Sequence, residues 1–192
     1  MHTGTGRITR MSMYPMSLFE SLESNGSISF RRLFDDNEYD IDGKTSPLSI
    51  EQLIFAACRG GWPASIDEMS QEAKLLIARD YVNEICDKDI SRVDKIHRNP
   101  ALARLILRTY ARNICTLAKK SSMINDIAVE MESISAPTFY DYVCALEKLF
   151  VIEDIEAWSP AIRSKTVIRT GKKRCFVDPS IAVAALGASP ES

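Results

Sequence analysis

The chain has 192 residues, of which 45% are hydrophobic and 26% charged, a composition typical of a globular protein and not of a disordered or fibrous one. Its formal net charge of -2 excludes a uniformly basic nucleic-acid binder. The sequence has no apolar run near the roughly 20 residues of a membrane helix and no signal-peptide core at its start, so we expect a cytoplasmic protein without a membrane partner.

The N-terminal region predicts a strand followed by a short helix. Apolar and polar residues alternate over residues 6–15, which favours a β-strand ended by Pro15. Ser17 and Glu20 then have the spacing of a capping box, in which each side chain satisfies a free amide at a helix start. A further helical turn is expected at residues 29–34, before an acidic run at residues 35–42.

Gly43, Lys44 and Thr45 match the end of a phosphate-binding loop, but the match is incomplete. Glu38 occupies the first glycine position, and the acidic residues before Gly43 would repel phosphate. The same stretch fails as a calcium loop, because Ser49 stands where a bidentate glutamate is needed. We therefore interpret it as a solvated turn and predict no metal site there.

The middle of the chain predicts three longer helices. Ser49 and Gln52 form a second capping box, and the helix that follows should end at the Gly60-Gly61-Trp62-Pro63 turn. Residues 70–87 carry an apolar helical face. Asn99 and Pro100 begin the clearest helix, whose apolar stripe continues to Leu117.

The last third has the order of a winged helix. A helix at residues 122–131, a turn, and a helix capped by Ser135 precede two extended segments that meet at a tight turn, Thr170-Gly171. A closing helix lies between Asp178 and Gly187. The predicted fold is mainly α with a small β component: residues 25–118 form a helical domain and residues 119–192 a winged-helix-like domain.

Candidate functional residues are few, and none forms a catalytic constellation. The five cysteines include no C-x-x-C pair, the two histidines lie beside none of them, and there is no G-x-S-x-G motif. We predict neither catalytic nor metal-ligating residues in this chain. An intact enzyme stays a third hypothesis. It would be supported if the chain hydrolysed ATP and kept that activity when Arg7 and Lys44 were replaced by alanine.

One segment has a strong charge asymmetry. Residues 159–177 contain six basic residues and no acidic one, namely Arg163, Lys165, Arg169, Lys172, Lys173 and Arg174. A basic wing tip can contact DNA phosphates. The helix in the recognition position offers Thr138 and Tyr140 but little that reads bases, so a solvated basic hairpin, or one docked on an acidic domain, is favoured over a DNA contact. A stand-alone winged-helix DNA-binding protein is the alternative.

Several motifs in order resemble one protein family. They are GRITRMSMYPMSLFES, the GGWP turn, RDYVNEICDKDI, the helix after RNPALARL, and FVIEDIEAWSPAIRSKTVIRTGKKRCFVDPSIAVAALG. Together they resemble the bacterial and archaeal AAA-type ATPases that carry a C-terminal domain of unknown function, number 4143. The resemblance covers nearly the whole chain.

The resemblance implies a middle segment of such an ATPase. Residues 1–24 would be the last strand and short helix of the ATPase core, without the phosphate loop or the C-terminal nuclease-like domain. ATP and magnesium belong to the parent protein, not to this segment. Arg7, and less strongly Arg10, would lie where other AAA proteins sense the γ-phosphate.

These expectations give one functional hypothesis. The chain is a non-catalytic helical and winged-helix module that couples nucleotide state to a macromolecular partner. Its partners would be the ATPase core and the C-terminal domain, with DNA at the basic hairpin as a further candidate. The orphaned strand, residues 6–14, would pair with another copy of the chain or be poorly ordered.

Overall fold

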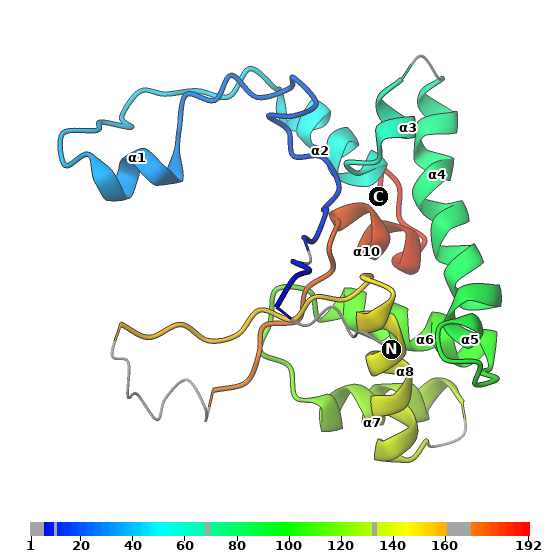
Figure 1. Cartoon of the computed structure of the whole chain (residues 1–192). Coiled ribbons are helices and arrows are strands. Elements are labelled where there is room, and N and C mark those ends of the chain that lie inside the picture. The colour runs from blue at the N-terminus through cyan, green and yellow to red at the C-terminus, as the bar shows by residue number, and fades with distance from the viewer. Residues whose placement is uncertain (1–5, 10, 68–69, 132–133, 161–169) are drawn as a thin grey trace.

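The computed structural model describes residues 6–9, 11–67, 70–131, 134–160 and 170–192. The elements in chain order are α1 (Phe30–Asp35), α2 (Ile50–Arg59), α3 (Pro63–Ile66), α4 (Gln71–Glu84), the π-helix η1 (Ile85–Asp89), α5 (Ile90–Arg92), α6 (Pro100–Arg112), α7 (Lys120–Glu130), α8 (Ala136–Lys148) and α10 (Pro179–Leu186) (Figure 1).

The helix starts expected from local sequence are confirmed. Ser49 and Gln52 form the capping box of α2, in which each side chain accepts from a backbone amide of the other residue. Asn99 caps α6 ahead of Pro100, and Ser135 caps α8. These starts depend on residues at most three positions apart, which explains why the sequence predicts them.

Two helices end differently from the expectation. The apolar stripe predicted a helix from Asn99 to Leu117, but α6 ends at Arg112. Cys115 takes a left-handed φ of 59°, and its amide donates to the carbonyl of Arg174 at 2.8 Å. The expected short helix after Ser17 is a single turn, although its capping hydrogen bond from Ser17 N to Glu20 Oε2 forms at 2.8 Å.

The core is one cluster of buried side chains from α4, η1, α5, α6, α7, α8, the segment just after α8, and α10. Tyr110, Ile106, Phe139 and Leu146 are fully buried in it, and so is Ile181 of the last helix. Helix α10 packs against α6, α4 and α2, so the C-terminal helix closes on the first half of the chain. Residues on both sides of the predicted boundary at 118 therefore share a core.

The predicted β component, and with it the winged helix, is wrong. The described part of the chain contains no strand, only the isolated bridges between Ile152 and Phe176 and between Ile155 and Lys173. Lys173 pairs with Ile155, whereas Arg174 N donates to Thr116 O at 2.9 Å. Because residues 173–177 divide their hydrogen bonds between two neighbours, neither pairing extends into a ladder. Residues 161–169 of the predicted ribbon lie outside the described residues.

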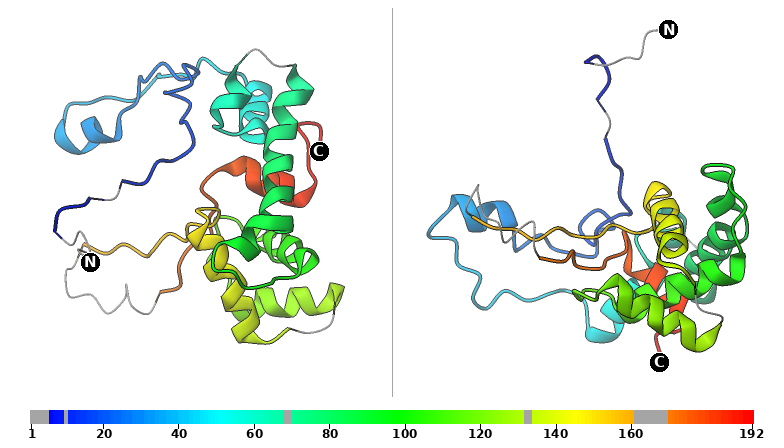
Figure 2. Two further views of the ribbon diagram at one scale, coloured as in Figure 1. Left: turned by 45° about the vertical axis from the view of Figure 1, so that its right-hand side comes forward. Right: turned by 90° about the horizontal axis from the view of Figure 1, so that it is seen from below.

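The N-terminal strand predicted at residues 6–15 is also wrong, because its described residues pair in no sheet. We call residues 6–48 the N-terminal arm and residues 49–192 the helical body. The arm meets the body around Met16, while its first residues project away from the body in one view and α1 lies well away from it in every view (Figures 1 and 2). Helix α1 has no buried residue. Among its described residues, the arm therefore adds no side chain to the core.

Candidate functional site

The paired glycines after α2 hold the arm on the body. Gly61 O accepts from Met16 N at 2.7 Å, and a Cβ at Gly61 would lie 2.1 Å from Met16 O. Gly60 has a φ of 78°, and its Cβ would lie 2.4 Å from Ser180 Oγ. The sequence predicted this pair as a helix stop. In the structure it also allows the backbone of Met16 and the side chain of Ser180 to come close, which a side chain on either glycine would block.

A buried carboxylate joins the glycine turn to α10. Asp178 accepts from Gly61 N and from Ser180 N, each at 2.8 Å, so it also caps the last helix. Ser180 Oγ in turn accepts from Trp62 Nε1 at 2.9 Å. These bonds fix the indole of Trp62 on the side of the body that faces the arm.

A second contact between arm and body is an ion pair. Glu23 of the arm accepts from Arg59 at the end of α2, with 2.7 Å between Arg59 Nη2 and Glu23 Oε2. Arg59 is buried, and its Nε has no partner among the described residues. Burial would raise the pKa of Glu23, but hydrogen bonds from Ser21 and Arg59 lower it overall. The arm thus neutralises a buried cation of the body.

Between residues 12–16 of the arm and the body lies a cleft of about 360 Å³, here called the Trp62 cleft. The lining residues used below are Met13, Tyr14, Trp62, Tyr81, Phe150 and Val177. The rings of Trp62 and Tyr81 lie 4.6 Å apart, and Tyr14 Oη donates to Glu153 at 2.8 Å. That bond to a carboxylate raises the pKa of Tyr14. The walls are thus largely apolar and aromatic, as in many binding clefts.

Phe150 lines this cleft, and its backbone has a conformation that aromatic residues rarely adopt. It follows the end of α8 with a φ of 56°. The closing hydrogen bonds run from Val151 N to Leu146 O at 3.0 Å and from Phe150 N to Glu147 O at 3.1 Å, the pattern of a Schellman motif. Glycine is the usual residue there, since left-handed backbone costs other residues about 1–2 kcal/mol.

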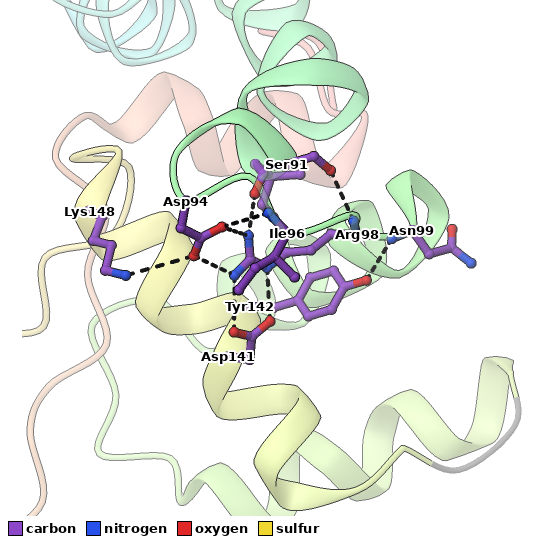
Figure 3. A network of polar contacts seen from close by, with 9 residues as sticks. Ser91, Asp94, Ile96, Arg98, Asn99, Asp141, Tyr142 and Lys148 are labelled. Atoms are coloured by element: carbon purple, nitrogen blue, oxygen red, sulfur yellow. Dashed lines mark hydrogen bonds and ion pairs between the residues drawn. The ribbon is translucent and has the colours of Figure 1, made fainter.

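A buried arginine joins the segment before α6 to α8 (Figure 3), the helix after which Phe150 follows. The Arg98 side chain is only 1% exposed and contacts Asp94 at 2.7 Å and Asp141 of α8 at 2.9 Å. The hydrogen bond from Arg98 lowers the pKa of Asp94 to about 2. Tyr142, also on α8, accepts from Asn99 N at 2.7 Å. In the sequence, only the neighbouring Asn99 cap hints at a role for Arg98, because its carboxylate partner Asp141 lies 43 positions away.

The structure gives Arg174 an internal role. It was predicted to contact DNA or a partner, but its guanidinium is buried and paired with the Asp154 carboxylate. Arg174 Nε also donates to Ala118 O at 3.0 Å. Tyr110 Oη lies 3.4 Å from the same carboxylate, so the pair ties residues 154 and 174 to α6.

The other predicted site residues are not gathered into one place. Lys172 pairs with Glu156 at 2.9 Å, and Lys173 is exposed beside its backbone bridge to Ile155. Thr138 belongs to the cap of α8, where its amide donates to Ser135 Oγ. Tyr140 is half-exposed, with Lys120 Nζ 4.8 Å from the centre of its ring.

The predicted nucleotide-sensing residues belong to the start of the arm. Arg7 lies exposed in a turn, while Arg10 falls outside the described residues, as do Arg163, Lys165 and Arg169 of the basic segment. In the incomplete phosphate-loop match, Lys44 Nζ donates to Ser27 O at 3.0 Å. Across the described ranges, no helix is long and apolar enough to span a bilayer.

The described chain is thus an all-helical body that carries an extended arm and an aromatic cleft between the two. The chain belongs to the family described as domain of unknown function (DUF8612), whose model matches residues 50–192. The match begins at the first residue of α2 and covers the helical body, with the arm outside it. No curated protein and no solved structure matches the sequence.

Proposed function

We propose that this chain is a non-catalytic module that binds the nucleotide-binding core of an AAA-type ATPase through its N-terminal arm. The body would then pass the nucleotide state of that core to a macromolecular partner. The observation that carries the proposal is the contrast between a closed core in the body and an arm with many exposed large apolar side chains. The ATPase class comes from the sequence resemblance.

The arm exposes several large apolar side chains, more than would be expected if it stayed free in solution. Phe30 and Phe34 on α1 are 81% and 85% exposed, and Met11 and Leu22 are each 91% exposed. Contiguous apolar patches on soluble proteins mark interaction sites, and buried aromatic anchors supply much of the energy of an interface. We therefore place the partner surface over α1.

The charges of the arm suggest the chemistry of that surface. Asp35 and Asp36 pair with arginines of α1, at 3.3 Å and 3.2 Å. Glu38, Asp40 and Asp42 follow as exposed carboxylates. An apolar surface with a basic rim would complement this arrangement. ATP and magnesium would be held by the ATPase core, with Arg7 of the arm as the residue facing the γ-phosphate.

Co-expression with an AAA-type ATPase encoded in the same genome tests this function. The two chains should co-purify, and replacing Phe30 and Phe34 together by Asp should abolish the complex. Val129→Asp is the matched control, because Val129 is 86% exposed on α7 of the body. Complex formation that is unaffected by the double substitution would contradict the proposal.

A kinetic measurement on the same complex tests Arg7. ATP hydrolysis by the complex should fall when Arg7 is changed to Ala and stay unchanged for Arg79→Ala, since Arg79 is exposed on α4 of the body, away from the proposed partner surface. Magnesium-dependent turnover by the isolated chain that survives alanine at both Arg7 and Lys44 would establish an enzyme in its own right and overturn the proposal.

A further inference from the structure

We infer that the Trp62 cleft is a second binding site, which takes a bulky apolar side chain of a partner peptide with a basic residue beside it. This inference does not depend on the ATPase core, because the cleft lies between arm residues 12–16 and the body, away from α1. Its size is suitable, since about 360 Å³ falls in the range of ligand-sized clefts.

The lining of the cleft exposes apolar groups to solvent. Met13 is 98% exposed, and Phe150 and Tyr14 are also exposed. Methionine and aromatic side chains together form adaptable surfaces that accept apolar groups of varied shape. Trp62 and Tyr81 lie in contact, with the indole oriented by Ser180. The wall on the body side is therefore prearranged, which lowers the ordering cost of binding.

The backbone of Phe150 gives an independent reason to assign a function here. Helix α10 ends with the same two closing hydrogen bonds, from Gly187 N to Ala184 O at 3.1 Å and from Ala188 N to Val183 O at 3.0 Å. Gly187 has a φ of 68°. The chain thus uses glycine for this motif at one helix end and strained phenylalanine at the other. Residues held in such conformations cluster at functional sites.

The charges beside the cleft select a cationic neighbour for the apolar group. Glu20 lines the cleft, and its hydrogen bonds from Ser17 lower its pKa, so it is ionised at neutral pH. Glu153 holds Tyr14, which lines the cleft. No lysine or arginine is among the lining residues. Complementarity therefore favours lysine or arginine next to the inserted side chain.

Selection from a phage library of random peptides tests the inference on the purified full chain. Enriched peptides should carry Phe, Leu or Trp beside Lys or Arg, and they should be lost in selection against Phe150→Gly. The absence of such enrichment, or enrichment of acidic peptides, would overturn the inference.

Fluorescence then measures the affinity of an enriched peptide that lacks tryptophan. The chain has two tryptophans, so the Trp158→Phe background leaves Trp62 as the reporter. Phe150→Gly should weaken binding about tenfold or more, as expected for an aromatic anchor. Val129→Ala, an exposed apolar position outside the cleft lining, should leave the dissociation constant unchanged.

Stability separates a binding role of Phe150 from a packing role. Glycine relieves the left-handed strain, so Phe150→Gly should raise Tm by about 2–4 °C while it weakens binding. Gly187→Ala should lower Tm, which calibrates the strain at the equivalent position of α10. A lower Tm for Phe150→Gly, or unchanged peptide binding, would overturn the inference.

Discussion

Gly61 illustrates how a single missing side chain can position a whole segment. Its backbone does not need the left-handed region, so alanine is excluded only by contact with Met16. The sequence identified the glycine pair as a helix stop because that role is local. The second role depends on a residue 45 positions away, and no local pattern reports it.

Replacing Gly61 by Ala should release the arm near Met16 without unfolding the body. The new Cβ would lie 2.1 Å from Met16 O, so the hydrogen bond from Met16 N must break. Hydrogen exchange of the Met16 amide should accelerate about tenfold or more, as for locally opened segments. Gly171→Ala is the control, since its Cβ would meet only Leu117 O at 4.0 Å. Equal exchange in both variants would contradict this role.

Asp94 should make the fold sensitive to acid. Its pKa falls from 3.8 in the unfolded chain to about 2 in the folded state, mainly through the hydrogen bond from Arg98. A depressed carboxyl pKa stabilises the fold above the unfolded value and loses that contribution as pH falls toward the folded value. The free energy of unfolding from urea titrations should therefore fall between pH 4 and about 2, and fall less in Asp94→Asn. Asp80→Asn, exposed on α4, should retain the wild-type slope.

At the scale of elements, α8 depends on one cation for its position. Arg98 connects the segment before α6 to α8 through Asp94 and Asp141, and all of these bonds form with an almost fully buried guanidinium. Such a network specifies one arrangement of α8 and the segment before α6, because without Arg98 the Asp141 carboxylate would lose its partner and Asp94 would keep only Ile96 N and Lys148. The end of α8 in turn sets the place of Phe150.

Arg98→Met should cost about 3 kcal/mol of unfolding free energy, because it leaves two carboxylates beside a cavity of low polarity. Arg104→Met offers a matched comparison: Arg104 contacts Asp87 at 2.8 Å, but both side chains are about half-exposed. We expect that substitution to cost about 0–1 kcal/mol. Denaturant titration measures both. Similar losses for the two variants would show that burial of Arg98 is unimportant.

The elements also show which features a sequence can predict. The starts of α2, α6, α8 and α10 follow from caps and prolines within three residues, and each is confirmed. The expected β ribbon failed because extended segments on either side of the Thr170-Gly171 turn do not reveal which neighbour supplies their hydrogen bonds. Arg174 was predicted as a surface cation, since its buried carboxylate partner lies 20 positions earlier.

At the scale of the whole molecule, the body should fold without the arm. Every core residue in the described ranges comes from Ala56 onward. A chain beginning at Ser49 should therefore unfold in a single cooperative transition, measured by circular dichroism, at a lower temperature than the full chain. A broad, non-cooperative transition would show that the arm is part of the folding unit.

The lower stability of the shortened chain has a specific cause that can be tested. Without Glu23, Arg59 would stay buried without its carboxylate. Arg59→Met should therefore raise the stability of the shortened chain by about 1 kcal/mol or more, because an unpaired buried charge is replaced by an apolar side chain. In the full chain the same change leaves Glu23 unpaired and should not stabilise. Equal effects in both backgrounds would contradict this assignment.

Asp178 gives the molecule a mechanical connection between its two ends. Tension applied to the arm passes from the Met16 amide to Gly61, from the Gly61 amide to this carboxylate, and so to the first turn of α10. A pull on the N-terminal side would thus load the last helix directly, without first deforming the packed interior.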